Sequence, residues 1–178
     1  MDGQFTGYAS LFGVPDLGRD VVAPGAFSAS LAARGAAGVR MLWQHDPAEP
    51  VGRWLSLDED ARGLRVAGQL NLAVRRAREL NALVNDGALD GLSIGFRTVR
   101  AVPERGGLRR LHSLDLWEIS LVTFPLQPGA RIAAKAVPRQ AEPLAQALHA
   151  FARRVAPPRA HPFTRPVAAR LPNRQRFA

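Results

Sequence analysis

The sequence predicts a mainly β, α+β fold in which a barrel of six or seven strands is flanked by helices. Short segments with strand-like alternation of apolar and polar residues follow one another through the first 125 residues. Only two segments in this part of the chain have the spacing of a helix, and turns rich in glycine, proline and aspartate separate the rest. A sheet of this many strands favours a closed or nearly closed barrel, because closure removes free strand edges.

The first half of the chain contains four predicted strands and one helix. Pro24 suits the approach to the helix, and Gly35 follows its end. The second strand is mostly apolar and ends where Pro47 interrupts strand pairing. The last two strands alternate regularly on either side of a turn, so they form a hairpin. The predicted elements are a strand over 4–12, a helix over 27–34, and strands over 39–44, 51–58 and 64–70.

The second half changes from helical to strand periodicity. Ala77, Leu80 and Val84 lie on one helical face, and Gly87 follows the last turn. A hairpin turn is predicted over 104–107, and Asp115 is assigned to a turn between two further strands. The predicted elements are a helix over 74–86 and strands over 92–101, 108–113 and 116–124.

Charge and composition divide the chain near residue 138. Residues 1–138 form the predicted folded domain, whereas residues 139–178 contain eight arginines and one acidic residue. This basic, proline-rich tail has one candidate helix over 143–155 and is otherwise expected to be disordered. The high isoelectric point therefore belongs to the tail, and nucleic-acid binding is expected only through it.

Composition also excludes several classes of function. The chain has no cysteine, so it has no disulfide framework, thiolate zinc site or cysteine nucleophile. No apolar run approaches the roughly 20 residues of a membrane span. The first residues lack the charged and apolar regions of a signal peptide, so a soluble, intracellular protein is expected.

The segment Gly91–Phe96 places Ser93 between two glycines, at the start of an apolar strand. Glycines beside a serine let another backbone approach, as acyl transfer requires. The letters match G-x-S-x-G, but that motif needs a strand before the serine and a helix after it, which is the reverse of the order predicted here. The alternative is a glycine-rich strand start with an incidental serine.

Two further residues are candidates for acid–base chemistry. His45 follows an apolar strand and is either a general base or a structural strand-end histidine. Glu118 lies within the apolar segment 116–122, where a buried carboxylate requires a partner. A histidine is a natural partner, because a carboxylate that orients the base is the third member of a catalytic triad.

Other polar residues compete for these roles. Asp46 adjoins His45 in sequence, so its side chain is expected to diverge, and His112 is an alternative third triad member to Glu118. His45, Asp46 and His112 show no recognisable metal-ligand spacing, so no metal and no cofactor is expected.

An ordered set of short motifs over residues 4–135 resembles the prohead (capsid maturation) serine proteases of tailed phages, a family distantly similar to the herpesvirus assemblin proteases. Each motif is weak alone, but the ordered set is specific. The motifs are Val21-Val22-Ala23-Pro24-Gly25-Ala26-Phe27, Met41-Leu42-Trp43-Gln44-His45-Asp46, Val51-Gly52, Gly63-Leu64, Gly87-Ala88-Leu89, Gly91-Leu92-Ser93-Ile94-Gly95-Phe96 and Trp117-Glu118-Ile119-Ser120-Leu121-Val122-Thr123-Phe124-Pro125.

The resemblance implies a serine endopeptidase on a herpesvirus-protease-like β-barrel, acting through an acyl-enzyme. It would work inside the assembling procapsid in the host cytoplasm. Its substrate would be the major capsid protein or that protein's scaffolding segment, and often the protease itself. The resemblance is compatible with a homodimer. The resemblance applies equally to a protein from a phage, a prophage or a gene transfer agent.

The resemblance also implies roles for individual residues. Ser93 corresponds to the nucleophile and His45 to the base, and Glu118 takes the third position, which it occupies 25 residues after Ser93. His112 is poorly placed by the same comparison. Arg131 is a candidate oxyanion stabiliser, with a solvated loop arginine as the alternative reading.

Two rival functions stay open at the level of sequence. One is a non-catalytic capsid assembly or scaffolding protein on the same barrel, which would tolerate loss of Ser93. The other is a nucleic-acid-binding protein that works through the basic tail and would show salt-dependent affinity.

Overall fold

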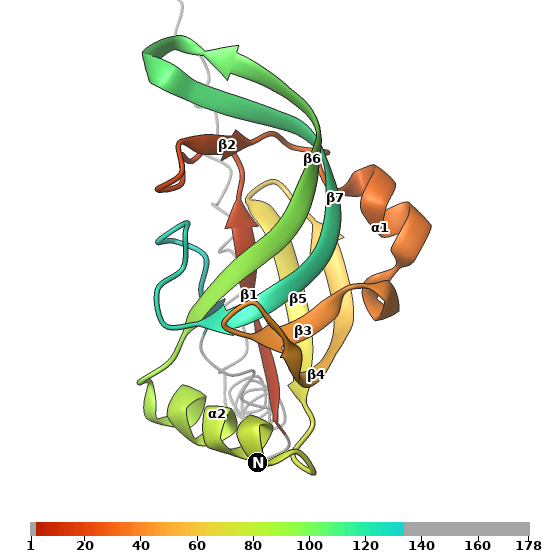
Figure 1. Ribbon diagram of the computed structural model, residues 1–178, viewed down its shortest axis with the longest axis vertical. Coiled ribbons are helices and arrows are strands. Elements are labelled where there is room, and N and C mark those ends of the chain that lie inside the picture. Colours follow the sequence, from red (N-terminus) through yellow and green to blue (C-terminus); the bar gives the residue numbers. More distant parts are fainter. Residues whose placement is uncertain (1–2, 134–178) are drawn as a thin grey trace, which may run out of the picture. The chain divides into compact units, whose positions relative to one another are not determined.

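The computed structural model describes residues 3–133. The tail over 139–178, including the predicted helix over 143–155, lies outside the described residues. The described part is a curled sheet with two α-helices, shown in Figure 1. The predicted mainly β, α+β barrel is therefore the observed fold class.

The described sheet has eight strands, whereas the sequence predicted six or seven. The strands are β1 (Gln4–Leu11), β2 (Asp20–Val22), β3 (Arg40–Trp43), β4 (Asp46–Glu59), β5 (Gly63–Leu70), β6 (Gly91–Glu104), β7 (Leu108–Val122) and β8 (Ile132–Ala133). The helices are α1 (Ser28–Arg34) and α2 (Arg75–Asp86), with short 3-10 turns η1 (Ala36–Gly38) and η2 (Arg105–Gly107).

The two extra strands are short. β2 has three residues and β8 has two, so neither carries the alternation by which longer strands are recognised. They exist because longer partners are available: β2 pairs with β7, and β8 pairs with β1.

Backbone hydrogen bonds nearly close the sheet into a barrel. The order is β2-β7-β3-β4-β5-β1-β8, and β6 pairs with β7 off this path. Residues 130–132 connect β6 to β1: Leu92 N donates to Ala130 O at 3.0 Å, and Tyr8 N donates to Arg131 O at 3.0 Å. The segment before β8 therefore joins the first strand to the strand of Ser93, as the predicted near-closure requires.

The strand β7 differs from the prediction. Two strands separated by a turn at Asp115 were expected, but residues 108–122 form one strand. Asp115 lies inside it, bound to Arg34 on α1 and to Arg97 on β6. These partners are distant in sequence, so local composition alone could not show that a carboxylate fits in mid-strand.

The strand β4 begins earlier than predicted. It starts at Asp46 rather than Val51 and contains Pro47 and Pro50. The β3–β4 register shifts twice near these residues, so irregular pairing accommodates prolines that lack a donor. The β4–β5 hairpin agrees with the prediction, as do both α-helices, and Gly87 ends α2 in the left-handed conformation at φ 80°.

The neighbours of Ser93 and Ser120 on their strands show which side of the sheet these two serines lie on. Leu92, Ile119 and Leu121 belong to the buried core. Because side chains alternate along a strand, Ser93 and Ser120 point to the other side of the sheet. They are nevertheless buried, with 6% and 0% of their surface exposed, and the turn between β3 and β4 contacts Ser120 through the hydrogen bond from His45 N.

Candidate active site

His45 directly follows β3, as the sequence indicated, and it lies at the tip of a β3–β4 hairpin that was not predicted. Trp43 pairs with Asp46, so Gln44 and His45 form a two-residue turn. Both have positive φ, 52° and 61°, which is rare for residues with side chains. Such turns normally use asparagine and glycine, so this turn stores local backbone strain.

Hydrogen bonds to β7 and to the residue that follows it hold the turn in place. Gln44 N donates to Leu121 O at 3.0 Å, and Gln44 Nε2 donates to Thr123 Oγ1 at 2.8 Å. His45 N donates to Ser120 Oγ at 3.0 Å. The imidazole is therefore attached to a turn that is fixed on the strand carrying Glu118.

Glu118 is largely, though not fully, buried and has a histidine partner, as the sequence favoured. Its Oε1 lies 2.6 Å from His45 Nδ1, and its side chain is 13% exposed. The hydrogen bond to Glu118 raises the pKa of His45 above its ordinary value of 6.5. Partial burial of the ring opposes this rise, and the negative charge of Glu118 adds to it.

The alternation of side chains is broken next to Glu118. Strict alternation along β7 predicts Leu116 on the same face as Glu118, but Leu116 faces the core with 0% exposure. The β6–β7 register shifts between Gly95 and Phe96, so Gly95 opposes Glu118 while Phe96 opposes Leu116. The bulge leaves Trp117 unpaired and 53% exposed.

Ser120 links the histidine and the carboxylate. Its hydroxyl accepts the bond from His45 N and donates to Glu118 Oε2 at 2.7 Å. Both oxygens of Glu118 are therefore bound, one by the imidazole and one by this hydroxyl. Ser120 was not among the predicted site residues, because nothing in the local sequence distinguishes it from an ordinary strand serine.

Ser93 lies on the same face of the sheet as this network. It stands directly opposite Ser120 on the neighbouring strand, and Gly95 stands opposite Glu118. Directly opposed residues of antiparallel strands project to the same side. The structure thus places Ser93, His45 and Glu118 on one side of the sheet, around Ser120.

Gly95 shows how closely the parts fit. A Cβ on Gly95 would lie against Glu118 Oε1, and 2.7 Å from the carboxylate carbon. The carboxylate therefore lies over the strand of Ser93 in space that only glycine leaves open. This contact gives the second glycine of the G-x-S-x-G match a role that differs from its role in a strand–turn–helix motif.

Ser93 and His45 are not hydrogen-bonded to each other in this structure. Neither Ser93 Oγ nor His45 Nε2 makes a hydrogen bond to a residue within 3–133. Nε2 is the free ring nitrogen, because Nδ1 is bound to Glu118. Catalytic bonds are often long without substrate and shorten only when substrate binds.

Arg131, the candidate oxyanion stabiliser, is close to Ser93 along the backbone. It bridges to Gly91, two residues before the serine. Its guanidinium is bound to the Asp90 carboxylate and donates to Pro128 O at 2.9 Å. A role for Arg131 at the oxyanion stays a prediction, because it would require the side chain to leave these partners.

The competing residues lie elsewhere. His112 precedes Glu118 by six residues on β7, which separates them by roughly 20 Å along the strand. Asp46 accepts a hydrogen bond from Ala48 N at 2.8 Å, at the start of β4. In residues 3–133 no group of three acidic, histidine or cysteine side chains could hold a metal ion. No helix in this range is long and apolar enough to cross a membrane.

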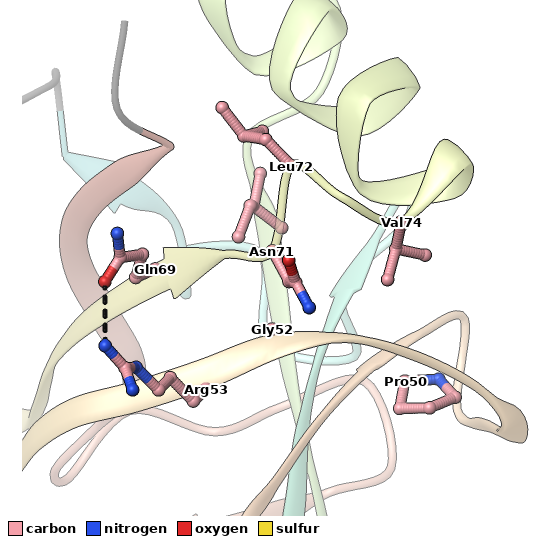
Figure 2. Close-up of a pocket in the computed structure, with 8 residues that line it drawn as sticks. Pro50, Gly52, Arg53, Gln69, Asn71, Leu72 and Val74 are labelled. Atoms are coloured by element: carbon pink, nitrogen blue, oxygen red, sulfur yellow. Dashed lines mark hydrogen bonds between the residues drawn. The ribbon is translucent and has the colours of Figure 1, made fainter.

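A hollow of about 620 Å³ lies away from these residues. It is bounded by the edges of β4 and β5 and by the segment that leads into α2, as Figure 2 shows. Arg53 Nη2 donates to Gln69 Oε1 at 3.4 Å on its wall. None of Ser93, His45 and Glu118 lines this hollow.

Sequence comparison places these residues in a known family. Residues 1–146 match the sequence model of the caudovirus prohead serine proteases, and the chain belongs to that family. It is 39% identical over 137 residues to the prohead protease of Enterobacteria phage HK97. That match covers 74% of this chain and 60% of the relative, so the chain spans less than two thirds of the relative's length.

Solved structures confirm the predicted fold. The capsid assembly protease of bacteriophage T4 superimposes with a TM-score of 0.55 at 10% identity, over 68% of this chain and 89% of that one. The KSHV protease, a herpesvirus enzyme solved with a hexapeptide phosphonate inhibitor, gives a TM-score of 0.52 at 16% identity. That match covers 73% of this chain and 63% of the other. The herpesvirus-protease-like barrel is thus the fold of this chain.

Proposed function

We propose that this chain is a serine endopeptidase that processes capsid or scaffold proteins during procapsid maturation. The observation that carries the proposal is the bonded His45–Glu118 pair on the face of the sheet that also bears Ser93. Family membership supports the reaction class, and the names of the HK97 and T4 proteins support the setting.

The proposed mechanism uses Ser93 as the nucleophile and His45 as the base. Nε2 removes the hydroxyl proton while Oγ bonds to the substrate carbonyl carbon, and the tetrahedral adduct then expels the amine. The amine takes its proton from Nε2, leaving an acyl-enzyme. Water, deprotonated by His45, attacks this ester and releases the acid and the free serine.

Glu118 has two roles in this scheme. Its bond to Nδ1 keeps the ring proton there, so Nε2 presents its lone pair to Ser93. Its charge also stabilises the imidazolium that forms when Ser93 loses its proton. The pKa of His45 is raised because Glu118 stabilises the protonated ring in the same way.

The proposed substrate is the major capsid protein or its scaffolding segment, with self-cleavage as a further reaction. The proposed location is the interior of the assembling procapsid in the host cytoplasm. A homodimer and DNA binding through the basic tail stay predictions from the sequence.

Cleavage of co-expressed capsid protein tests the proposal. Ser93→Ala removes the attacking oxygen and His45→Ala removes the proton acceptor, so each should lower processing by about 10³-fold or more. The full chain and each variant are co-expressed with the capsid protein, and the products are identified by gel and intact mass.

Two matched variants serve as controls. His112→Ala removes a histidine outside the proposed site, and Ser113→Ala removes a serine from the same strand as Ser120. Both should process capsid protein normally. Normal processing by Ser93→Ala would refute the protease and favour the non-catalytic assembly protein. A silent His112→Ala also separates the two candidates for the third triad position.

A further inference from the structure

Ser120 makes the two hydrogen bonds that connect the strained turn to the carboxylate. It is fully buried, and it stands between Ser93 on β6 and Leu42 on β3 in the registers of the two neighbouring strands. We infer that Ser120 is a positioning residue that fixes both His45 and Glu118 for catalysis. This inference rests on the proposed function and adds a residue that the triad does not contain.

The bond to Glu118 fixes the carboxylate. Oε1 is held by His45 and Oε2 by Ser120, at 2.6 and 2.7 Å. Without the hydroxyl, Oε2 would be a nearly buried, charged oxygen with no donor, which is a costly arrangement. The carboxylate would then turn toward water or another donor, and its bond to Nδ1 would weaken.

The bond to His45 N fixes the turn. His45 has φ 61°, a conformation that a histidine adopts only when surrounding contacts impose it. Ser120 Oγ accepts the amide hydrogen of this same residue. One hydroxyl thus controls both the backbone that carries the imidazole and the acid that orients the ring.

A serine suits this position better than other residue types. A hydroxyl donates one hydrogen bond and accepts others at the same time, as the two observed bonds require. Alanine can do neither, and aspartate would place a second charge beside Glu118. Threonine would add a methyl group at a position with no exposed surface.

The matched control for Ser120→Ala is Ser30→Ala. Ser30 is also buried, at 7% exposure, and its Oγ accepts a hydrogen bond from the amide of Leu116 at 2.9 Å. Both variants therefore remove a hydroxyl that accepts a hydrogen bond from a backbone amide, that of Leu116 for Ser30 and that of His45 for Ser120. Only Ser120 also contacts His45 and Glu118, so a loss due to general destabilisation should appear in both variants.

The experiment uses the full chain and a fluorophosphonate probe. The probe phosphonylates an activated serine: a P–O bond to Ser93 Oγ forms, fluoride leaves, and the hydroxyl proton passes to His45. Mass spectrometry identifies the labelled residue and gives the second-order rate. NMR titration of the histidine ring protons gives the pKa of His45, with His45→Ala used to assign its signals.

We expect Ser120→Ala to fold and to lower the labelling rate at Ser93 by at least about tenfold. Its His45 pKa should fall toward the ordinary value, because the bond that raises it is weakened. Ser30→Ala should keep the wild-type rate and the wild-type pKa.

A wild-type rate or an unchanged His45 pKa in Ser120→Ala would overturn the inference, while labelled wild-type Ser93 would leave the protease intact. Failure of the wild-type chain to label at Ser93 would instead count against the proposed function itself. If Ser120→Ala does not fold, Ser120→Cys serves as the second variant, because a thiol fills the same space but donates and accepts only weak hydrogen bonds, and the same two measurements decide.

Discussion

The two halves of the β6–β7 hairpin are built differently, although they belong to the same pair of strands. The proximal half, residues 91–96 with 116–122, carries the proposed site. The distal half, residues 97–104 with 108–115, continues to η2 at the end of the domain opposite α2 (Figure 1). Both halves have comparable backbone pairing, so the contrast lies in their side chains.

The proximal half has small side chains on its outer face, and the distal half has charged ones. Gly91, Ser93 and Gly95 leave room for groups from β7 and from the 123–125 loop. The distal half instead forms ion pairs near solvent, Arg109 with Asp20 and Arg110 with Glu104. In the proximal half, close packing limits the size of the side chains. In the distal half, the surface ion pairs add little stability. Substitutions should therefore be tolerated very differently along one hairpin.

Glu118→Gln should have the largest effect among the substitutions that test this contrast. We expect the labelling rate of Ser93 to fall by about 10³-fold, because glutamine cannot stabilise the imidazolium. Glu118 raises the pKa of His45, so the acid limb of the wild-type pH–rate profile should lie above 6.5. The limb should move to lower pH in the variant. An acid limb at the same pH in the variant would show that Glu118 does not set the pKa of the base.

The same substitution should change how stability depends on pH. Since the pKa of His45 is raised on folding, the stabilisation from its protonated form is complete below about 6.5 and is lost as pH rises through the folded value. The wild-type advantage over Glu118→Gln in urea unfolding should therefore shrink over that window. An advantage that grows with pH would contradict the sign of the shift.

Gly95→Ala should follow in size. The new Cβ would meet the Glu118 carboxylate, so either the carboxylate or the strand must move. We expect about a 10²-fold loss of labelling and a loss of about 1–3 kcal/mol in unfolding free energy.

The control for Gly95→Ala is Gly106→Ala at the distal tip. Gly106 has open space around its Cβ position but φ +75°. It should lose about 1 kcal/mol through backbone strain and label normally. Equal loss of labelling in both variants would remove the contrast between the two halves.

Arg105→Ala should have the smallest effect. Arg105 is exposed in η2 at the distal end. We expect a change below about 0.5 kcal/mol in unfolding free energy and an unchanged labelling rate. Differential scanning calorimetry and the probe assay measure both, and a loss of labelling would show that the distal half supports the site.

The sequence predicted the elements whose signal is local. The β4–β5 hairpin and α2 have regular periodicity, and the structure contains both. It could not predict that β7 is continuous, because Asp115 is accommodated by Arg34 and Arg97, which lie far away in sequence.

The candidate site divides in the same way. The contact between His45 and Glu118 was anticipated, because a carboxylate in an apolar strand needs a partner. Ser120 and the left-handed turn were not anticipated. Ser120 looks like any strand serine, and glutamine and histidine are not typical of positive φ. The catalytic roles of Ser93, His45 and Glu118 stay predictions until the variants are measured.

The bonds that close the barrel affect the order in which the site is assembled. Leu92 donates to Ala130 O and Tyr8 donates to Arg131 O, so the strand of Ser93 acquires its last neighbours from a segment near the end of the described domain. On the ribosome, β1 and β6 are both synthesised before those acceptors. Contacts between such distant parts of a chain form slowly, since a long loop must close first. Because the barrel closes only after residue 131 has emerged, a nascent chain contains all three proposed catalytic residues before it contains the segment that closes the barrel around them.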